Sequence, residues 1–170
     1  MLCKEVDKLK KYEYDSTRYF WGVTAPGIFM IMLLIYGIKE NINNPTFGIP
    51  SLIIITTLYG INNTFIALSH PKTIVIDKEG IEFHSFGRVH SYSWARLDYF
   101  MVKEFSARKL YLRIENPKLF KGRYWIKTNM YNDSDELYLK INKEEKRIHP
   151  NLLKFKAKKR RPNKKKRRKK

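Results

Sequence analysis

Two long, uncharged apolar segments separated by a short polar stretch occupy the first half of the chain. Segment 19–38 (YFWGVTAPGIFMIMLLIYGI) has no charged residue, and none occurs between positions 41 and 69. A helix that crosses the hydrocarbon core of a bilayer needs about 20 predominantly apolar residues. The sequence therefore predicts a membrane α-helical hairpin, with transmembrane helices at 19–38 and 47–69 and an extracytoplasmic turn at 39–46.

The ends and interior of the first segment suit a membrane span. Trp21 and Tyr36 lie near its two ends, where aromatic belts occur. Pro26 and Gly27 are tolerated in membrane helices, although they would disrupt a soluble one. A buried core helix is the alternative. A cleaved signal peptide is disfavoured because the apolar run exceeds the roughly 7–15 residues of a signal core and no small-residue cleavage pattern follows.

Polar and small residues gather near the end of the second segment. Gly60 would let the two helices approach closely. Asn62 and Asn63 are costly in lipid unless they face a partner helix or the interface. We predict a helix–helix contact at Gly60, Asn62 and Asn63. A position of the asparagines near the headgroups is one alternative, and a polar lining is the other.

The distribution of basic residues orients the predicted hairpin. Of the formal net charge of +19, thirteen positive charges come from residues 154–170, which leaves +6 for the rest. Two crossings place the N-terminal arm, 1–18, on the same side as this tail. The positive-inside rule then predicts a multi-pass cell-membrane protein with both termini in the cytoplasm.

After the apolar segments, short runs of alternating apolar and polar residues predict antiparallel strands. Turns are expected at Lys78-Glu79-Gly80 and Gly87-Arg88, where glycine permits a positive φ. The predicted strands are 73–77, 81–86, 89–94, 97–105, 110–115 and 123–128.

A helix is expected to close this region. Ser134 is the predicted N-cap and is followed by two acidic residues, and Leu137, Ile141 and Ile148 recur near one face. Residues 70–153 thus read as a small α+β, mainly antiparallel β, cytoplasmic domain with a C-terminal helix.

Several short motifs in this region carry a resemblance to a known fold. The turn Lys78-Glu79-Gly80, the step Trp94-Ala95-Arg96-Leu97 and the closing helix resemble those of a bacterial pleckstrin-homology-like (PH-like) domain. This resemblance implies a small bacterial two-pass membrane protein with a PH-like domain at 70–153, which need not bind phosphoinositides.

More narrowly, the chain resembles the EbsA family of lactic-acid-type Gram-positive bacteria. The likeness lies in Arg123-Tyr124-Trp125, in His149-Pro150-Asn151 and in the aromatic residues near the first span, Tyr12, Tyr14, Tyr19 and Trp21. That family is often labelled pore-forming, so the resemblance implies a homo-oligomeric pore-forming or transport-related protein as an alternative function.

No motif in the sequence indicates catalysis or a cofactor. His84 and His90 flank one turn but lack a carboxylate or thiol at ligand spacing, so no metal site is predicted. Cys3 has no histidine nearby, and a single cysteine cannot form an internal disulfide. Glycine-rich phosphate loops, nucleophile elbows and metalloprotease motifs do not occur. We expect a non-enzyme without a cofactor.

The basic tail, 154–170, predicts disorder because its like charges repel and it has almost no apolar residue to bury. It is expected to contact anionic lipid. Nucleic acid is an alternative partner, and a simple topology signal is another. The predicted contact residues are Lys158, Lys159, Arg160, Arg161, Lys164, Lys165, Lys166, Arg167, Arg168, Lys169 and Lys170.

These features predict a scaffold or interaction module at the cytoplasmic face of the membrane, with a protein partner or a second copy of itself. The pore described above and a membrane tether for nucleic acid are the alternatives. No headgroup pocket is predicted in the β-domain, because its basic residues do not form one dense run: Arg88, Arg96, Lys103, Arg108 and Lys109.

Overall fold

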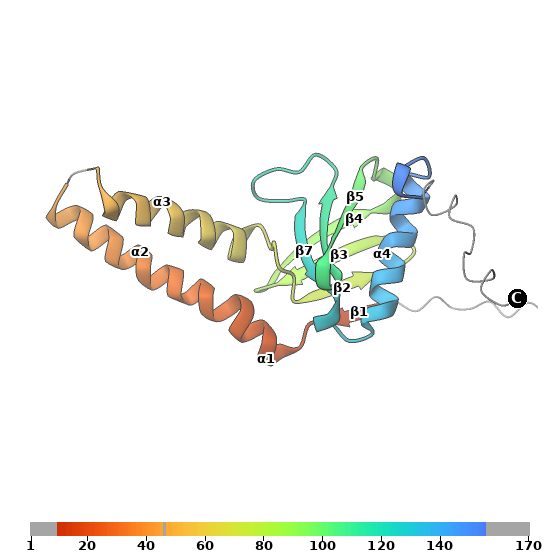
Figure 1. The fold of residues 1–170 in the computed structure, drawn as a ribbon, viewed down its shortest axis with the longest axis horizontal. Helices are drawn as coiled ribbons and strands as arrows, with labels where there is room; N and C mark the ends of the chain where they lie inside the picture. Colours follow the sequence, from red (N-terminus) through yellow and green to blue (C-terminus); the bar gives the residue numbers. More distant parts are fainter. Residues whose placement is uncertain (1–9, 46, 156–170) are drawn as a thin grey trace, which may run out of the picture.

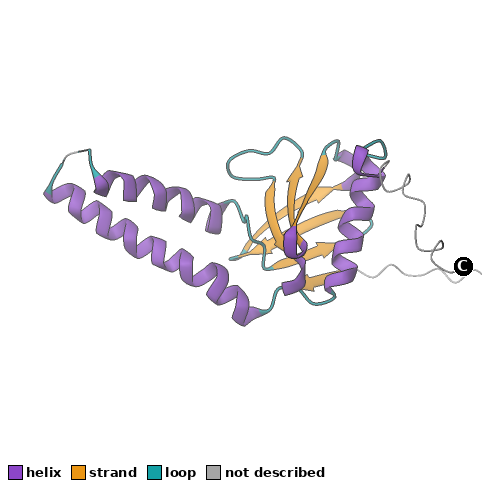
Figure 2. Cartoon of the chain, in the orientation of Figure 1, coloured by secondary structure: helices purple, strands orange, loops and turns teal. Residues whose placement is uncertain are grey.

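In the computed structural model, which describes residues 10–45 and 47–155, two long apolar helices pack against each other. Two antiparallel sheets and a C-terminal helix follow them, so the architecture is mixed α+β (Figure 1). The hairpin projects from one side of the β-domain, and the C-terminal helix lies on the other side (Figure 2).

The first long helix is continuous over Ser16–Asn43. It comprises α1 (Ser16–Tyr19), a wider π-type turn at Phe20–Thr24 and α2 (Ala25–Asn43). Proline lacks an N–H group, and Pro26 sits just after the turn in which the hydrogen-bond ladder changes spacing. The helix is longer than the predicted span and continues into the segment expected to be a turn, because Lys39 and Glu40 favour a helix.

The second long helix runs over Ile49–Ile66. It consists of α3 (Ile49–Ile61) and a π-type turn at Asn62–Ile66, and Pro50 occupies its first turn. With 18 residues it extends about 27 Å, and the first helix has 28 residues. Both helices are long and apolar enough to cross a membrane.

The seven strands form two antiparallel sheets. In the first, the strand order is β1-β2-β3-β4, and in the second it is β5-β6-β7. The strands of the first sheet are β1 (Lys10–Glu13), β2 (Thr73–Ile76), β3 (Gly80–Ser85) and β4 (Arg88–Ser93). Those of the second are β5 (Phe100–Phe105), β6 (Lys109–Ile114) and β7 (Arg123–Lys127). The six strands expected from alternation all occur, with ends shifted by up to three residues.

Strand β1 was not expected, because residues 1–18 were predicted to be an arm outside the β-domain. Lys10 is opposite Ile76 and Glu13 is opposite Thr73, so β1 pairs along its whole length with β2. The helical hairpin is therefore inserted between two neighbouring, hydrogen-bonded strands of one sheet.

The two sheets pack face to face around an apolar core. Phe83 of β3 stacks on Tyr124 of β7, with ring centroids 3.9 Å apart. Alternate residues of the strands point inward, and Ile81, Leu110 and Leu112 are fully buried. The apolar residues of the alternating pattern thus lie on one face of each sheet, and the two faces share one core.

Helix α4 (Ser134–Ile148) closes the open edges of the two sheets. Leu137 and Ile141 are buried, as the helical periodicity predicted. The prediction that Ser134 is the N-cap was wrong by one residue: Asp133 is the N-cap, and Ser134 is the first helical residue. The Asp133 carboxylate lies 3.4 Å from the Lys10 ammonium of β1. The Tyr12 hydroxyl on β1 donates to Glu136 at 3.0 Å, which joins the start of α4 to the first sheet.

Candidate functional site

The joint between the hairpin and the β-domain is built from tyrosines. The Tyr19 hydroxyl, at the start of the first long helix, donates to the carbonyl of His70 at 2.8 Å and lies 2.5 Å from the Ser85 hydroxyl. The Tyr131 hydroxyl donates to the carbonyl of Pro71, where the chain leaves the second long helix. Both connections are therefore hydrogen-bonded to the domain.

Leu68 and Phe86 add apolar contacts to the joint. Leu68 follows the second long helix in a left-handed conformation (φ 50°) and is completely buried in the domain core. Phe86, in the tight β3–β4 turn, is also left-handed (φ 48°) and lies against Phe65 of the hairpin, with ring centroids 4.8 Å apart. A left-handed backbone is unfavourable for residues that have a Cβ atom, so the packing around Leu68 and Phe86 must stabilise it.

Small residues let the two long helices approach. A Cβ atom on Gly60 would overlap the side chain of Met30 in α2, and one on Gly27 would lie 2.8 Å from the ring of Phe65. A Cβ on Gly37 would lie 3.1 Å from Ile53. Gly60 therefore lies between the helices, where close approach requires a residue without a side chain.

Asn62 and Asn63 lie in the π-type turn at the base of the hairpin. The amide nitrogen and oxygen of Asn62 are inaccessible to solvent and have no hydrogen-bond partner among residues 10–45 and 47–155. Asn63 is partly buried, and its backbone carbonyl accepts the Ser69 N–H at 3.1 Å. No described contact joins either amide side chain to the first long helix by a hydrogen bond.

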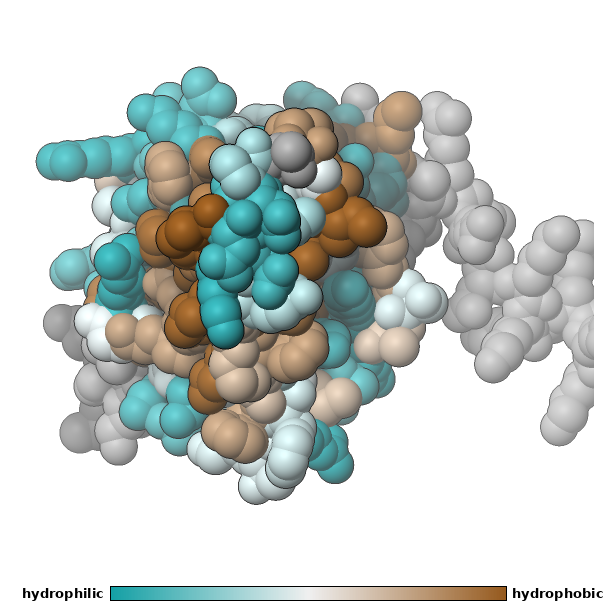
Figure 3. Space-filling model, turned by 90° about the vertical axis from the view of Figure 1, so that its left-hand side faces the viewer, coloured by the Kyte–Doolittle hydropathy of each residue, from teal (hydrophilic) through white to brown (hydrophobic). Residues whose placement is uncertain are grey.

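Large apolar side chains cover the outside of the hairpin. Trp21, Ile35 and Ile42 are 71%, 63% and 74% exposed. Figure 3 looks onto the hairpin end of the molecule, where apolar surface surrounds the polar turn at the hairpin tip and hydrophilic surface gathers at the rim. A surface of this extent is unfavourable in water and favourable in lipid.

The outer face of the β5–β6–β7 sheet combines cations with aromatic rings. We call it the basic–aromatic face. The rings of Tyr111 and Trp125 are 4.5 Å apart, Phe105 lies 5.4 Å from Trp125, and the Lys109 ammonium sits 4.3 Å from the Trp125 ring. None of its five cations has an ion-pair partner within the described residues; they are Lys103, Lys109, Arg113, Arg123 and Lys127.

The sequence did not predict this face, because the basic residues were judged as a contiguous run. The basic residues lie at alternate positions within each strand, which places them on one face of the sheet. The pairing of Arg113 with Arg123 and of Lys109 with Lys127 across β6 and β7 then makes them neighbours. Arg88, Arg96 and Arg108 lie elsewhere, and Arg108 pairs with Asp135.

Two histidines of the domain are kept neutral. Burial, followed by the charges of Lys127 and Lys109, lowers the pKa of His70 to about 4. Burial, followed by Lys121 and Arg88, lowers the pKa of His90. The basic–aromatic face thus gains no further charge from His70 near neutral pH.

His90 is the partly buried end of a hydrogen-bonded chain between the sheets. Its Nδ1 lies 2.8 Å from the Tyr124 hydroxyl, which lies 2.8 Å from the Tyr92 hydroxyl. Burial raises the pKa of Tyr92 to about 12, and it also raises the pKa of Tyr124 well above its usual value. Both phenols therefore stay protonated near neutral pH. Because these groups satisfy one another, the chain contributes to the specificity of sheet packing.

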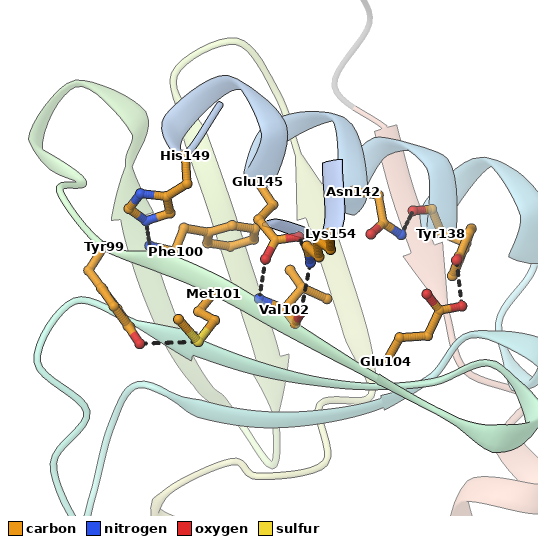
Figure 4. Close-up of polar contacts among 10 residues, drawn as sticks. All are labelled: Tyr99, Phe100, Met101, Val102, Glu104, Tyr138, Asn142, Glu145, His149 and Lys154. Carbon is orange, nitrogen blue, oxygen red and sulfur yellow. Dashed lines mark hydrogen bonds and ion pairs between the residues drawn. The ribbon is translucent and has the colours of Figure 1, made fainter. Parts of the chain in front are cut away.

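Side chains of α4 and of the residues just after it satisfy the free edge of β5 (Figure 4). Nε2 of His149 accepts the Phe100 N–H at 3.2 Å, and the fully buried carboxylate of Glu145 accepts the Val102 N–H at 2.8 Å. Glu145 also forms an ion pair with Lys154, whose ammonium donates to the Val102 carbonyl at 2.9 Å. An edge strand covered in this way is protected from pairing with another chain.

An open cleft of about 470 Å³ lies at the root of the β6–β7 loop. Arg96, Asp98, Tyr99, Arg113 and Glu115 are among its lining residues. Its charges are mixed in sign, and Arg113 Nε is buried without a hydrogen-bond partner in the described part of the chain. Acidic and basic side chains line the cleft together, so it does not favour a ligand of either charge.

The histidines do not assemble into a metal site in the described residues. No group of three or more His, Cys, Asp or Glu side chains in ligand geometry occurs in 10–45 and 47–155. His84 lies 3.0 Å from Glu82, and His90 contacts Tyr124 instead of approaching His84.

The predicted lipid or nucleic-acid contacts of the tail, Lys158 to Lys170, lie outside the described residues. Lys154 and Phe155 were expected to begin that tail, but Lys154 is bound to the domain through Glu145 and Val102. The described chain ends beside α4, away from the hairpin (Figure 1). This position weakens the argument that the tail starts next to lipid.

Comparison of the chain with known protein families, with curated proteins and with solved structures found no match. The fold and the site therefore define only a class, an α+β protein with two helices suited to a membrane.

Proposed function

We propose that this chain is a non-enzymatic, two-pass membrane protein that holds a PH-like scaffold domain at the cytoplasmic face of the cell membrane. The basic–aromatic face of the domain binds an acidic surface of a protein partner there. The observation that carries the proposal is the insertion of the apolar hairpin between the paired strands β1 and β2.

This insertion supports a scaffold because it fixes the domain relative to the membrane. A domain on a flexible linker would rotate freely, whereas this one is joined at both ends of the hairpin through Tyr19 and Tyr131. Its surfaces are thereby held at fixed heights above the bilayer, which reduces the entropy lost when a membrane-bound partner docks.

The order of the elements supports a PH-like domain. A four-stranded and a three-stranded antiparallel sheet pack together, and a C-terminal helix closes their open edges. In this interpretation the hairpin is an insertion between the first two strands of the domain.

The chemistry of the basic–aromatic face supports an acidic partner. Its cations have no ion-pair partner in the described chain, and they surround Tyr111 and Trp125. Aromatic residues and arginine are enriched at the centres of protein interfaces. Complementary charge guides a partner of opposite sign to such a face.

The test is zero-length carbodiimide crosslinking, which joins a lysine to a carboxylate, in native membranes with the full-length protein. The variant Lys103→Glu with Lys127→Glu reverses two charges of the face. The matched control, Lys143→Glu with Lys146→Glu, reverses two exposed charges on α4.

We expect a discrete crosslinked partner that the control retains and that the face variant loses roughly tenfold or more, since two reversed charges cost at least 1–2 kcal/mol. Equal loss in both variants would contradict the role of the face. A ladder of the protein alone would contradict the scaffold and support the homo-oligomeric, pore-forming alternative.

A further inference from the structure

The loop between β6 and β7 ends in two exposed apolar residues. The Lys118 N–H donates to the Lys121 carbonyl at 2.9 Å, which closes a tight turn with Leu119 and Phe120 at its tip. Leu119 is 51% exposed and Phe120 is 54% exposed. Two adjacent large apolar side chains at the tip of a loop are unfavourable in water.

The backbone of this loop holds its tip in one position. The Ile114 N–H donates to the Gly122 carbonyl at 3.0 Å, and Gly122 has a φ of +92°. A Cβ at position 122 would lie 2.8 Å from the Ile114 carbonyl oxygen, so only glycine fits. Pro117 restricts the other side of the loop. The apolar tip is therefore built into the fold.

The tip faces the same side of the domain as the hairpin. Figure 1 shows the loop above β7 bending toward the hairpin, to about the level at which the second long helix ends. The Trp125 N–H of β7 donates to the carbonyl of Ser69 at 2.7 Å, shortly after that helix ends at Ile66. The strand that follows the loop is thus hydrogen-bonded to the chain where it leaves the hairpin.

The charges around the tip complement an anionic surface. Lys118 and Lys121 flank the apolar pair, and Arg123 follows, whereas Glu115 is the one acid of the loop. Lys121 is exposed while its ammonium lies 4.6 Å from the Tyr92 ring. Basic residues beside apolar side chains favour the boundary between anionic headgroups and acyl chains.

We infer that Leu119 and Phe120 insert into the cytoplasmic interface of an anionic bilayer, as a third membrane contact beside the two helices. This inference rests on the proposed insertion of the hairpin. With the hairpin across the membrane, the rigid joint brings the loop tip to the level of the headgroups. A bilayer is favoured over a protein as the occupant because the tip reaches the level at which the second long helix ends, where a membrane crossed by the hairpin would have its surface.

The test uses the full-length protein, with Cys3→Ser, in vesicles of phosphatidylcholine with or without phosphatidylglycerol. Single cysteines carry a polarity-sensitive fluorophore, and lipids with a nitroxide near the headgroup quench it by contact. The labelled positions are Phe120→Cys, the hairpin control Ile35→Cys and the distal control Ala95→Cys. Ala95 is exposed in the turn Trp94–Arg96, beside the end of β3 that lies away from Tyr19.

We expect strong quenching at position 120 in the anionic vesicles and none at position 95. Lys118→Gln, which removes one positive charge, should lower the docked fraction by roughly fivefold, the contribution of about one basic residue near an anionic surface. Quenching at position 120 no stronger than at position 95, with position 35 inside the bilayer, would overturn the loop contact alone. Exposure of position 35 to water would instead overturn the proposed membrane insertion.

Discussion

Replacing the partly exposed Lys154 should destabilise the domain more than replacing its buried partner Glu145. The Glu145 carboxylate is fully buried and accepts the Val102 N–H at 2.8 Å, whereas the Lys154 side chain is 40% exposed. Lys154→Ala leaves a buried carboxylate without its counter-ion. Glu145→Gln removes the charge and keeps an oxygen that can accept the Val102 N–H.

The magnitudes follow from this asymmetry. An uncompensated charge left by a broken buried pair costs about 3–5 kcal/mol. We take about 3 kcal/mol for Lys154→Ala, because water can approach the pair from the exposed side of Lys154. Loss of charge with the hydrogen bond retained costs about 1 kcal/mol for Glu145→Gln. The double variant should resemble Glu145→Gln, which gives a coupling of about 3 kcal/mol in magnitude.

The assay is thermal unfolding of the full-length protein in detergent. At roughly 2–4 °C per kcal/mol for a chain of this size, Lys154→Ala should lower Tm by roughly 6–12 °C and Glu145→Gln by roughly 2–4 °C. Lys146→Ala, an exposed lysine on α4, is the control. A Lys154→Ala variant as stable as the control, or additive costs in the double variant, would refute the reasoning.

Three further changes test the joint, the hairpin and the pH dependence. Tyr19→Phe removes two hydrogen bonds at the joint and should cost about 1–2 kcal/mol in unfolding experiments; a cost near zero would show that the joint does not depend on the hydroxyl. Gly60→Ala should cost about 1 kcal/mol, with recovery when Met30→Ala is added, whereas Gly22→Ala, which meets no atom within 4 Å, should be neutral. Equal effects at the two glycines would contradict close helix packing. The pKa of His70 is lowered to about 4 by burial, so between pH 6.5 and 4 the unfolded chain binds more protons and stability falls as the pH falls, by up to about 3 kcal/mol. His70→Asn should flatten that decline in Tm measured against pH, and an unchanged slope would exclude His70 as its source.

Much of the architecture follows from local sequence patterns. The uncharged apolar runs predicted two long helices, alternation predicted six of the strands, and helical periodicity predicted α4. Strand β1 could not be predicted in this way, because KKYE has one apolar residue and its partner strand is sixty residues further along the chain. The pairing is created by the fold, after the hairpin returns the chain to its starting side.

The candidate site was less predictable, because its residues meet only across strands. The cations of the basic–aromatic face become neighbours through the registers of β5, β6 and β7. Glu145 offered a signal that was overlooked. It lies four residues after Ile141, on the buried stripe of α4, where an acid requires a partner. Its partners, Val102 and Lys154, come from other elements and could not be read from the helix.

The central claim is that the hairpin crosses the membrane and leaves the β-domain in the cytoplasm. The most direct measurement is labelling of single cysteines by a membrane-impermeant maleimide, in spheroplasts and after their lysis, on a Cys3→Ser background. Asn44→Cys, at the tip of the hairpin, should react in intact spheroplasts, and Ala95→Cys, in the β-domain, should react only after lysis. Reaction of Ala95→Cys in intact spheroplasts, or of Asn44→Cys only after lysis, would contradict the claim.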